Sequence, residues 1–298
     1  MKNGIGISAA LVAVCLTQVC FAETDDGSKI LPIVIESKSC ADRIDITNPD
    51  QACWKDAAPV TLGLARQNVQ EPKIQDTGIA ALTVRSVHGR GIMAFLIEWA
   101  DATKDDGLRS EKFADGVAVE FPLATDTMPD YRMGNDDKPV CLMLWRAERQ
   151  RARLDSGVSF HDENYPNAWS DAYTFDPKAV GAKVTQAAKT EREKYLASRA
   201  AGNPDVIGIA PVVEELSARS WVRLTVQKEQ DARGYGAWKN GRWRVIIARP
   251  MVTADEEDAR LEENSTWPVA FAAWDGAKQN AGPRKMVVDG WVQVKIAP

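Results

Sequence analysis

Short runs in which hydrophobic and polar residues alternate recur along this chain and predict a fold made mainly of β-strands. Alternation is typical of a strand that buries one face, because successive side chains point to opposite sides. Continuous apolar runs indicate further strands that are covered on both faces. The predicted strands span residues 30–35, 81–88, 92–99, 116–121, 140–145, 221–227, 244–250, 269–274 and 291–296.

Turn residues separate these runs and indicate how the strands connect. Gly89-Arg90-Gly91 and Asn240-Gly241 are hairpin signals. One helix is predicted after Asp176, with Pro177 at its first position and Gly202-Asn203-Pro204 at its end. A parallel α/β fold would need helices between successive strands. The pattern therefore predicts a mainly β fold, an antiparallel β-sandwich with one helix and long loop insertions.

The first 22 residues have the features of a secretory signal peptide. Lys2 supplies the positive end, residues 5–19 the apolar core, and Cys20-Phe21-Ala22 a cleavage-site-like end. We expect export to the periplasm, and residues 23–298 are predicted to form a single domain that begins with a polar arm over about 23–56. No later stretch reaches the length of a membrane span.

Composition and charge narrow the possible partners and cofactors. The chain has 298 residues, 45% of them hydrophobic, and a net charge of −5 that argues against a nucleic-acid partner. Ten Trp residues indicate extensive aromatic packing or a large flat ligand. Only two His are present and no Cys-x-x-Cys-His occurs, which excludes covalent c-type haem attachment by that signature.

The cysteines and histidines leave several interpretations open. Cys40 and Cys53 are close in sequence and could form a disulfide in an oxidising compartment, whereas Cys141 is expected to be an inert buried thiol. His88, at the end of a predicted strand, is interpreted as a solvated residue of a hairpin rim rather than a metal ligand. His161 is interpreted as part of an exposed polar loop.

The segment 115–145 contains two predicted strands and a loop that ordinary packing does not explain. Its first strand ends at Pro122, which cannot donate to a strand ladder. Met133 and Gly134 follow each other within the loop. Methionine usually fills gaps inside elements, and glycine lets another group approach the backbone closely. The pair indicates a site where a ligand approaches the backbone and meets a soft thioether sulfur.

Several segments in one order give the chain a resemblance to a known family. They are the Phe-Pro strand end with the Met-Gly loop and the strand ending in Trp145, Ala201 to Pro204 with Pro211 to Leu216, Trp238 to Pro250, Val269 to Gly276, and Gly282 to Lys285. The chain resembles the haem b (gamma) subunit of the ethylbenzene dehydrogenase type, in the type II dimethyl sulfoxide reductase family of periplasmic molybdenum oxidoreductases. The resemblance runs from about residue 115 to the C-terminus. Where the family often has Gly-Phe-Gly, this chain has Arg219-Ser220-Trp221, which puts the local pocket shape in question.

The resemblance implies a cofactor and a role. In that family a Met and a Lys are the axial ligands of haem b, and Met133 and Lys285 are the matching positions; Lys239 in a hairpin turn is the rival for the second position. A six-coordinate haem passes electrons, so the resemblance implies a non-catalytic electron-transfer subunit. Its implied partners are an iron–sulfur subunit, a molybdopterin catalytic subunit and a soluble periplasmic cytochrome.

Two other functions are compatible with the residues. A secreted β-sandwich with many Trp could be a carbohydrate-binding module in which aromatic rings stack on sugars. The chain could also be a structural assembly protein that has lost its haem. We see no nucleophile–base pair, phosphate-binding Gly loop or metal-ligand cluster that would support independent catalysis.

Overall fold

The computed structural model describes residues 32–75, 78–154, 163–164, 201 and 210–298. The predicted signal peptide, the predicted helix after Asp176 and His161 lie outside these residues. Within the described part of the chain, no helix is long and apolar enough to cross a membrane.

The described residues form thirteen strands and two α-helices, with a short 3-10 helix near the C-terminus. Their bounds are β1 Val34–Ser39, α1 Ala52–Asp56, β2 Val60–Arg66, β3 Ala81–Gly89, β4 Ile92–Ala100, β5 Gly116–Pro122, β6 Val140–Arg146, α2 Ala147–Leu154, β7 Val213–Ala218, β8 Leu224–Val226, β9 Arg233–Trp238, β10 Arg242–Pro250, β11 Thr266–Trp274, η1 Gly276–Lys278, β12 Met286–Val288 and β13 Val292–Ile296.

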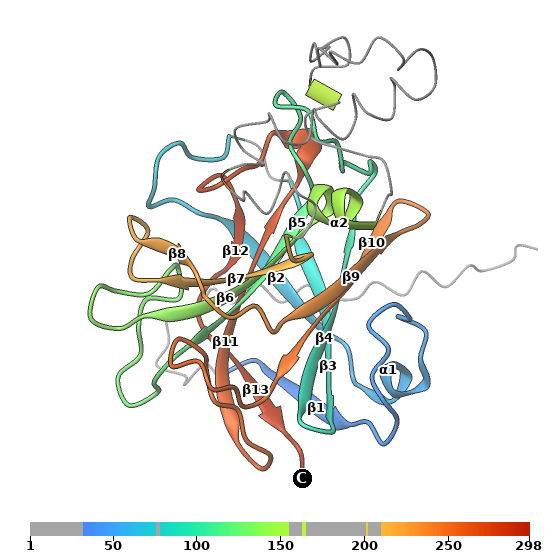
Figure 1. Ribbon diagram of the computed structural model, residues 1–298, viewed down its shortest axis with the longest axis vertical. Coiled ribbons are helices and arrows are strands. Elements are labelled where there is room, and N and C mark those ends of the chain that lie inside the picture. The colour runs from blue at the N-terminus through green and yellow to red at the C-terminus, as the bar shows by residue number, and fades with distance from the viewer. Residues whose placement is uncertain (1–31, 76–77, 155–162, 165–200, 202–209) are drawn as a thin grey trace, which may run out of the picture. The chain divides into compact units, whose positions relative to one another are not determined.

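The strands form one continuous hydrogen-bonded path that folds back on itself (Figure 1). The order is β8-β7-β6-β5-β11-β12-β2-β3-β4-β10-β9, and β1 and β13 pair with each other beside β3 and β11. All pairs are antiparallel except β1 with β13 and β1 with β3. The prediction of a mainly β fold is confirmed.

The core lies between the two halves of this path. Phe95 of β4 packs against Phe121 of β5 with ring centroids 6.0 Å apart, although these strands are not hydrogen-bonded neighbours. Trp145 of β6 packs against Trp243 of β10 at 5.0 Å and against Trp99 at 6.5 Å. Face-to-face packing of the inner side chains is what holds a sandwich together. Core packing therefore accounts for these three of the ten Trp residues, whose rings are fully buried.

The alternation of hydrophobic and polar residues did not predict strands that bury few side chains or that carry charged residues. β2 was missed because Leu62 is its only fully buried side chain. β7 was missed because it carries Glu214 and Glu215. Residues 147–154 form α2, a helix that the sequence pattern did not predict. The strand expected over 221–227 is reduced to the three residues of β8.

The structure also tests the expectations for His88 and Cys141. The interpretation of His88 as solvated was wrong, because its side chain is 1% exposed and its Nδ1 atom lies 3.1 Å from Ser37 Oγ. Cys141 is buried as expected, and burial raises the pKa of its thiol to about 11. Cys40 and Cys53 are neighbouring free thiols in one hydrophobic cluster, so their disulfide stays a prediction.

Candidate functional site

A cavity of about 750 Å³ lies on the outer face of the β5–β8 half of the sheet. Its wall is apolar: Ala118, Leu142, Leu144 and Leu216 line it, from three adjacent strands. The outer face of a sandwich normally carries polar side chains. An apolar outer face beneath a cavity of this size is typical of a site for a large apolar ligand.

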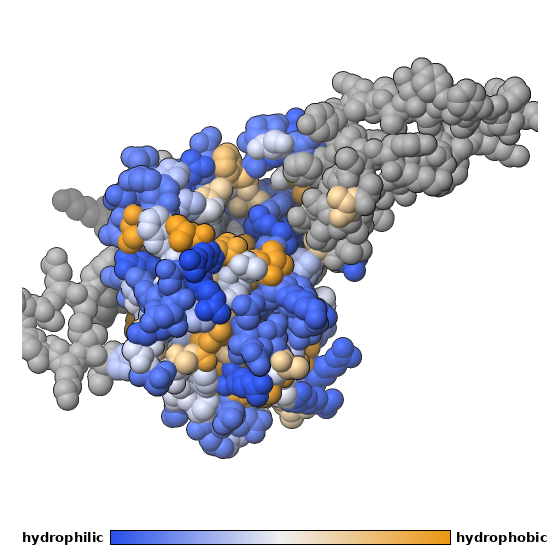
Figure 2. Space-filling model, turned by 60° about the vertical axis from the view of Figure 1, so that its left-hand side comes forward, coloured by the Kyte–Doolittle hydropathy of each residue, from blue (hydrophilic) through white to orange (hydrophobic). Residues whose placement is uncertain are grey.

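The edge strand β8 and the turn before it form an open rim of the cavity. Trp221, Leu224 and Val226 line the cavity, yet they are 53%, 51% and 57% exposed. Figure 2 brings this side of the molecule forward and shows apolar patches set among hydrophilic surface. Ser220 has φ of 69°, a conformation that favours glycine. Residues 219–221, which put the pocket shape in question at the level of sequence, thus place a strained Ser and a large Trp at the rim.

The loop between β5 and β6 carries Met133 in an unusual backbone conformation. Its φ is 112°, and Gly134 after it has φ of 69°. A Cβ atom on Gly134 would lie 2.8 Å from the carbonyl oxygen of Lys138, so only glycine fits there. Asp130 braces the turn by accepting from the backbone N–H of Gly134 at 2.9 Å and of Arg132 at 2.9 Å.

This loop is fastened to the turn between β12 and β13. The Tyr131 hydroxyl donates to Asp289 at 2.7 Å, and Trp291 Nε1 donates to the Pro129 carbonyl at 2.9 Å. These bonds join segments about 160 residues apart in the chain. They position the Met133 loop over the region that also carries Lys285.

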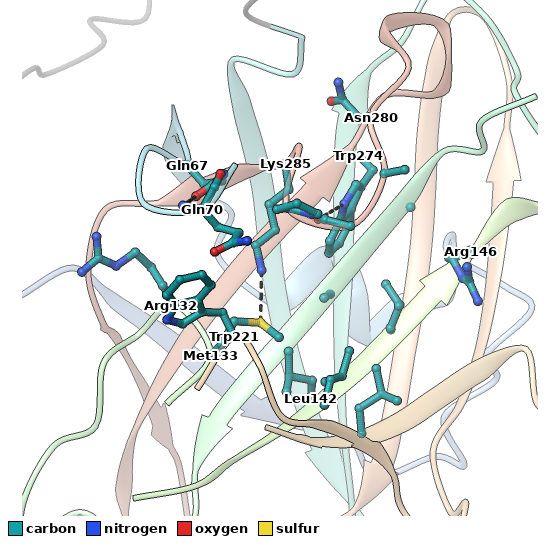
Figure 3. Close-up of a pocket in the computed structure, with 18 of the residues that line it drawn as sticks. Gln67, Gln70, Arg132, Met133, Leu142, Arg146, Trp221, Trp274, Asn280 and Lys285 are labelled. Carbon is teal, nitrogen blue, oxygen red and sulfur yellow. Dashed lines mark hydrogen bonds between the residues drawn. The ribbon is translucent and has the colours of Figure 1, made fainter. Parts of the chain in front are cut away.

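Lys285 lies just before β12, and its side chain points at Met133 (Figure 3). Its Nζ atom lies 3.2 Å from Met133 Sδ and 5.6 Å from the centre of the Trp274 ring. Its backbone carbonyl accepts from the N–H of Gln67 at 3.1 Å, which fixes the start of β12 against the end of β2. The residue is 9% exposed.

Burial governs the electrostatics of this pair. Burial lowers the pKa of Lys285, and the carboxylate of Glu120 opposes that shift. Burial likewise raises the pKa of Glu120 to about 8, against the effect of the Lys285 charge. Glu120 also accepts a hydrogen bond from the backbone N–H of Met133 at 3.4 Å. The cavity therefore favours a neutral amine beside a thioether, with a carboxyl group next to both.

The structure separates the two Lys candidates. Lys239 is exposed in the turn between β9 and β10, and its N–H donates to the Arg242 carbonyl at 2.9 Å. It does not line the cavity, whereas Met133 and Lys285 do.

Sequence reasoning missed Glu120, because a Glu between Val119 and Phe121 is what a half-exposed strand would carry. The signal that could have found it is the apolar outer face around it, with Ala118 on the same strand.

A family model described as ethylbenzene dehydrogenase matches residues 51–286. The match covers most of the chain and includes both cavity-lining residues singled out above. The chain belongs to the ethylbenzene dehydrogenase family. The matched range also includes Ser220 and Trp221 at the rim of the cavity.

Three curated proteins are similar to this member of the ethylbenzene dehydrogenase family. A protein of Haloferax mediterranei, named as a respiratory nitrate reductase heme subunit, is 22% identical, with 84% of this chain and 68% of that protein covered. The chlorate reductase subunit gamma of Ideonella dechloratans is 23% identical over 85% of this chain and 80% of its own length. The dimethylsulfide dehydrogenase subunit gamma of Rhodovulum sulfidophilum is 22% identical over 68% of this chain and 55% of its own length.

A solved structure described as a carbohydrate-binding protein from Bacteroides uniformis also aligns with the chain. It covers 89% of this chain and 100% of that one, with 6% identity and a TM-score of 0.43. At that TM-score the alignment supports no conclusion on fold or function.

Proposed function

We propose that this protein is the electron-transfer subunit of a molybdenum oxidoreductase complex and carries one non-covalent haem b, with Met133 and Lys285 as the axial ligands of its iron. The observation that supports this most is the contact of 3.2 Å between Lys285 Nζ and Met133 Sδ inside the cavity of a chain of this family. The names of the relatives add support, since one is a heme subunit and two are gamma subunits of oxidoreductases.

The cavity suits a flat, largely apolar group. Its wall is aliphatic, and its rim exposes Trp221, Leu224 and Val226, which a bound tetrapyrrole would cover. Burial of apolar surface of this kind contributes roughly 25 cal/mol per Å². Arg132 and Arg146 also line the cavity (Figure 3), where they pair with Asp130 and with Glu148 and Glu214, and the ionised groups of such a ligand could compete for them.

The donor pair suits iron. An ammonium group has no lone pair, so Lys285 can ligate only as a neutral amine, and its burial favours that state. A thioether ligand on the other side favours ferrous iron. Both side chains are unbranched, so they can move apart from their direct contact and admit a metal between them.

If Met133 and Lys285 both held the iron, no coordination site would remain for oxygen or substrate. The group, when bound, supplies one-electron transfer. The protein supplies its orientation, an apolar surrounding and two ligands, and it catalyses no reaction of its own.

The partners follow from the same proposal. An electron-transfer subunit needs a donor and an acceptor: we propose an iron–sulfur subunit and a molybdopterin catalytic subunit on one side, and a soluble periplasmic cytochrome on the other. Export by the predicted signal peptide of residues 1–22 would place the chain in the periplasm, where such a cytochrome is found.

Purification from the native source tests the proposal. The protein should copurify with an iron–sulfur subunit and a large molybdenum-containing subunit, and acid–acetone should extract its haem into the organic phase. Haem that stays on the polypeptide would contradict the non-covalent b-type assignment. Isolation as a stable monomer without partners would contradict the role in a complex.

A further inference from the structure

Glu120 is a buried acid behind the Met133 loop, and neither the fold nor the ligand pair accounts for it. It lies on the outer face of β5, opposite Leu142 of β6 and in the same row as Leu216 of β7. Its side chain is 5% exposed. A carboxyl group in such a place costs free energy unless it accepts hydrogen bonds. Its Oε1 atom accepts one from the backbone N–H of Met133, at 3.4 Å.

Met133 needs such a partner because its backbone is strained. A φ of 112° is rare for a residue with a side chain, and such conformations persist only where the surroundings hold them. The hydrogen bonds made by Asp130 brace the turn from within the loop itself. The bond to Glu120 instead joins the backbone of Met133 to the sheet.

Glu120 also acts on Lys285, the other member of the pair. Both side chains are buried, and the charged form of each would favour the charged form of the other, against the effect of burial on both pKa values. One carboxyl group on the strand β5 thus contacts the backbone of one candidate ligand and interacts electrostatically with the amine of the other. Sites on strands hold functional groups more firmly than sites on loops do.

We propose that Glu120 is a positioning residue for the cofactor: its carboxyl oxygen holds the Met133 backbone so that the thioether points into the cavity toward Lys285. This inference rests on the proposed function, because the direction of the thioether matters only if Met133 is a ligand. When the acceptor is removed, the loop relaxes toward an ordinary φ and the thioether turns away from the iron.

Two substitutions separate the hydrogen bond from the charge. Glu120→Gln keeps an oxygen that can accept from Met133, whereas Glu120→Leu removes the acceptor at similar size. The readouts are the fraction of low-spin ferric haem by absorption and electron paramagnetic resonance, and the midpoint potential. Met133→Ala gives the reference spectrum without the thioether. We expect wild-type spectra for Glu120→Gln, and for Glu120→Leu a shift of about five-fold toward thioether-free iron.

Glu215 offers a matched control. It is a buried acid on β7 whose Oε2 atom accepts from the backbone N–H of Ala232 at 2.8 Å, and it pairs with Met143 on the core side of the sheet. Glu215→Leu should lower thermal stability and leave the low-spin fraction unchanged.

The outcomes are distinct. A wild-type spectrum for Glu120→Leu overturns the inference, and so does a Glu120→Gln protein that behaves like Glu120→Leu. If neither Glu120→Leu nor Glu120→Ala folds, Glu120 serves the stability of the sheet and the inference is also overturned. A wild-type protein that binds no haem refutes the proposed function itself, and is recognised before any variant is made.

Discussion

Lys285 Nζ lies 3.2 Å from Met133 Sδ although 152 residues separate them in the chain. Two connections on one side of the sandwich bring them together: the β5–β6 loop, fastened by Tyr131 and Trp291, and the segment that enters β12. The contact depends on the fold as a whole and not on either segment alone. It is the geometry on which the proposed function rests.

Met133→Ala removes the thioether and should leave the iron with an open position. We expect a shift toward high spin and a midpoint potential lowered by more than about 60 mV, which is a tenfold change in the relative binding of ferrous and ferric iron, because thioether ligation favours the ferrous state. Spectroelectrochemical titration measures both. Met128→Ala is the control, since Met128 lies in the same loop, 39% exposed and outside the cavity lining. An equal effect of both variants would contradict the assignment.

Lys285→Ala should likewise perturb the spin state, whereas Lys239→Ala should leave the Soret band where it is. The reason is position: Lys285 lines the cavity and Lys239 is exposed at a hairpin turn. Absorption spectra of the two variants at equal haem loading decide between them. A changed spectrum for Lys239→Ala together with an unchanged one for Lys285→Ala would reverse the choice of ligand.

Most of the strands around this site could be predicted from the sequence, but only some of its functional side chains could. Alternating and continuous apolar runs predicted β3 to β6, β10, β11 and β13, because each presents apolar side chains to the core. The continuous run over 140–145 indicated that β6 is covered on both faces, but it did not say what covers the outer face, and β7 was not predicted at all. Met133 could be singled out from the sequence because a Met beside a Gly is unusual in a loop, although in the structure it also packs against a small hydrophobic cluster of β6 and β7. Glu120 was not recognisable, because its burial depends on strands and loops distant in the chain.

Asp115 should make stability depend on pH. Burial is the main cause that raises its pKa to about 7 from a usual value of 3.8, and the neighbouring Asp101 adds to the effect. The folded protein therefore binds more protons than the unfolded chain between these values, and its free energy of unfolding falls as pH rises through that window. Urea unfolding at several pH values should show a smaller fall for Asp115→Asn. The same slope in Asp115→Asn and the wild type, with the exposed Asp126→Asn as control, would contradict this.

Gly236→Ala should destabilise the fold. A Cβ atom there would lie 2.3 Å from Cζ2 of Trp145, a fully buried ring that packs against two other Trp residues. Overpacking a core of this kind costs about 1–3 kcal/mol. Thermal unfolding measures the effect, and Gly63→Ala is the control because nothing lies within 4 Å of its Cβ position. Equal melting temperatures for the two variants would show that the Trp cluster can shift to admit a methyl group.

The absorption spectrum of the purified wild-type protein, read with a pyridine haemochrome assay, tests the central claim most directly. The account predicts one haem b per chain, a Soret band and a low-spin six-coordinate spectrum in both oxidation states. A haem-loaded protein with a high-spin spectrum would contradict the ligand pair of Met133 and Lys285. A protein without a Soret band, purified from cells that supply haem, would contradict the proposed function as a whole.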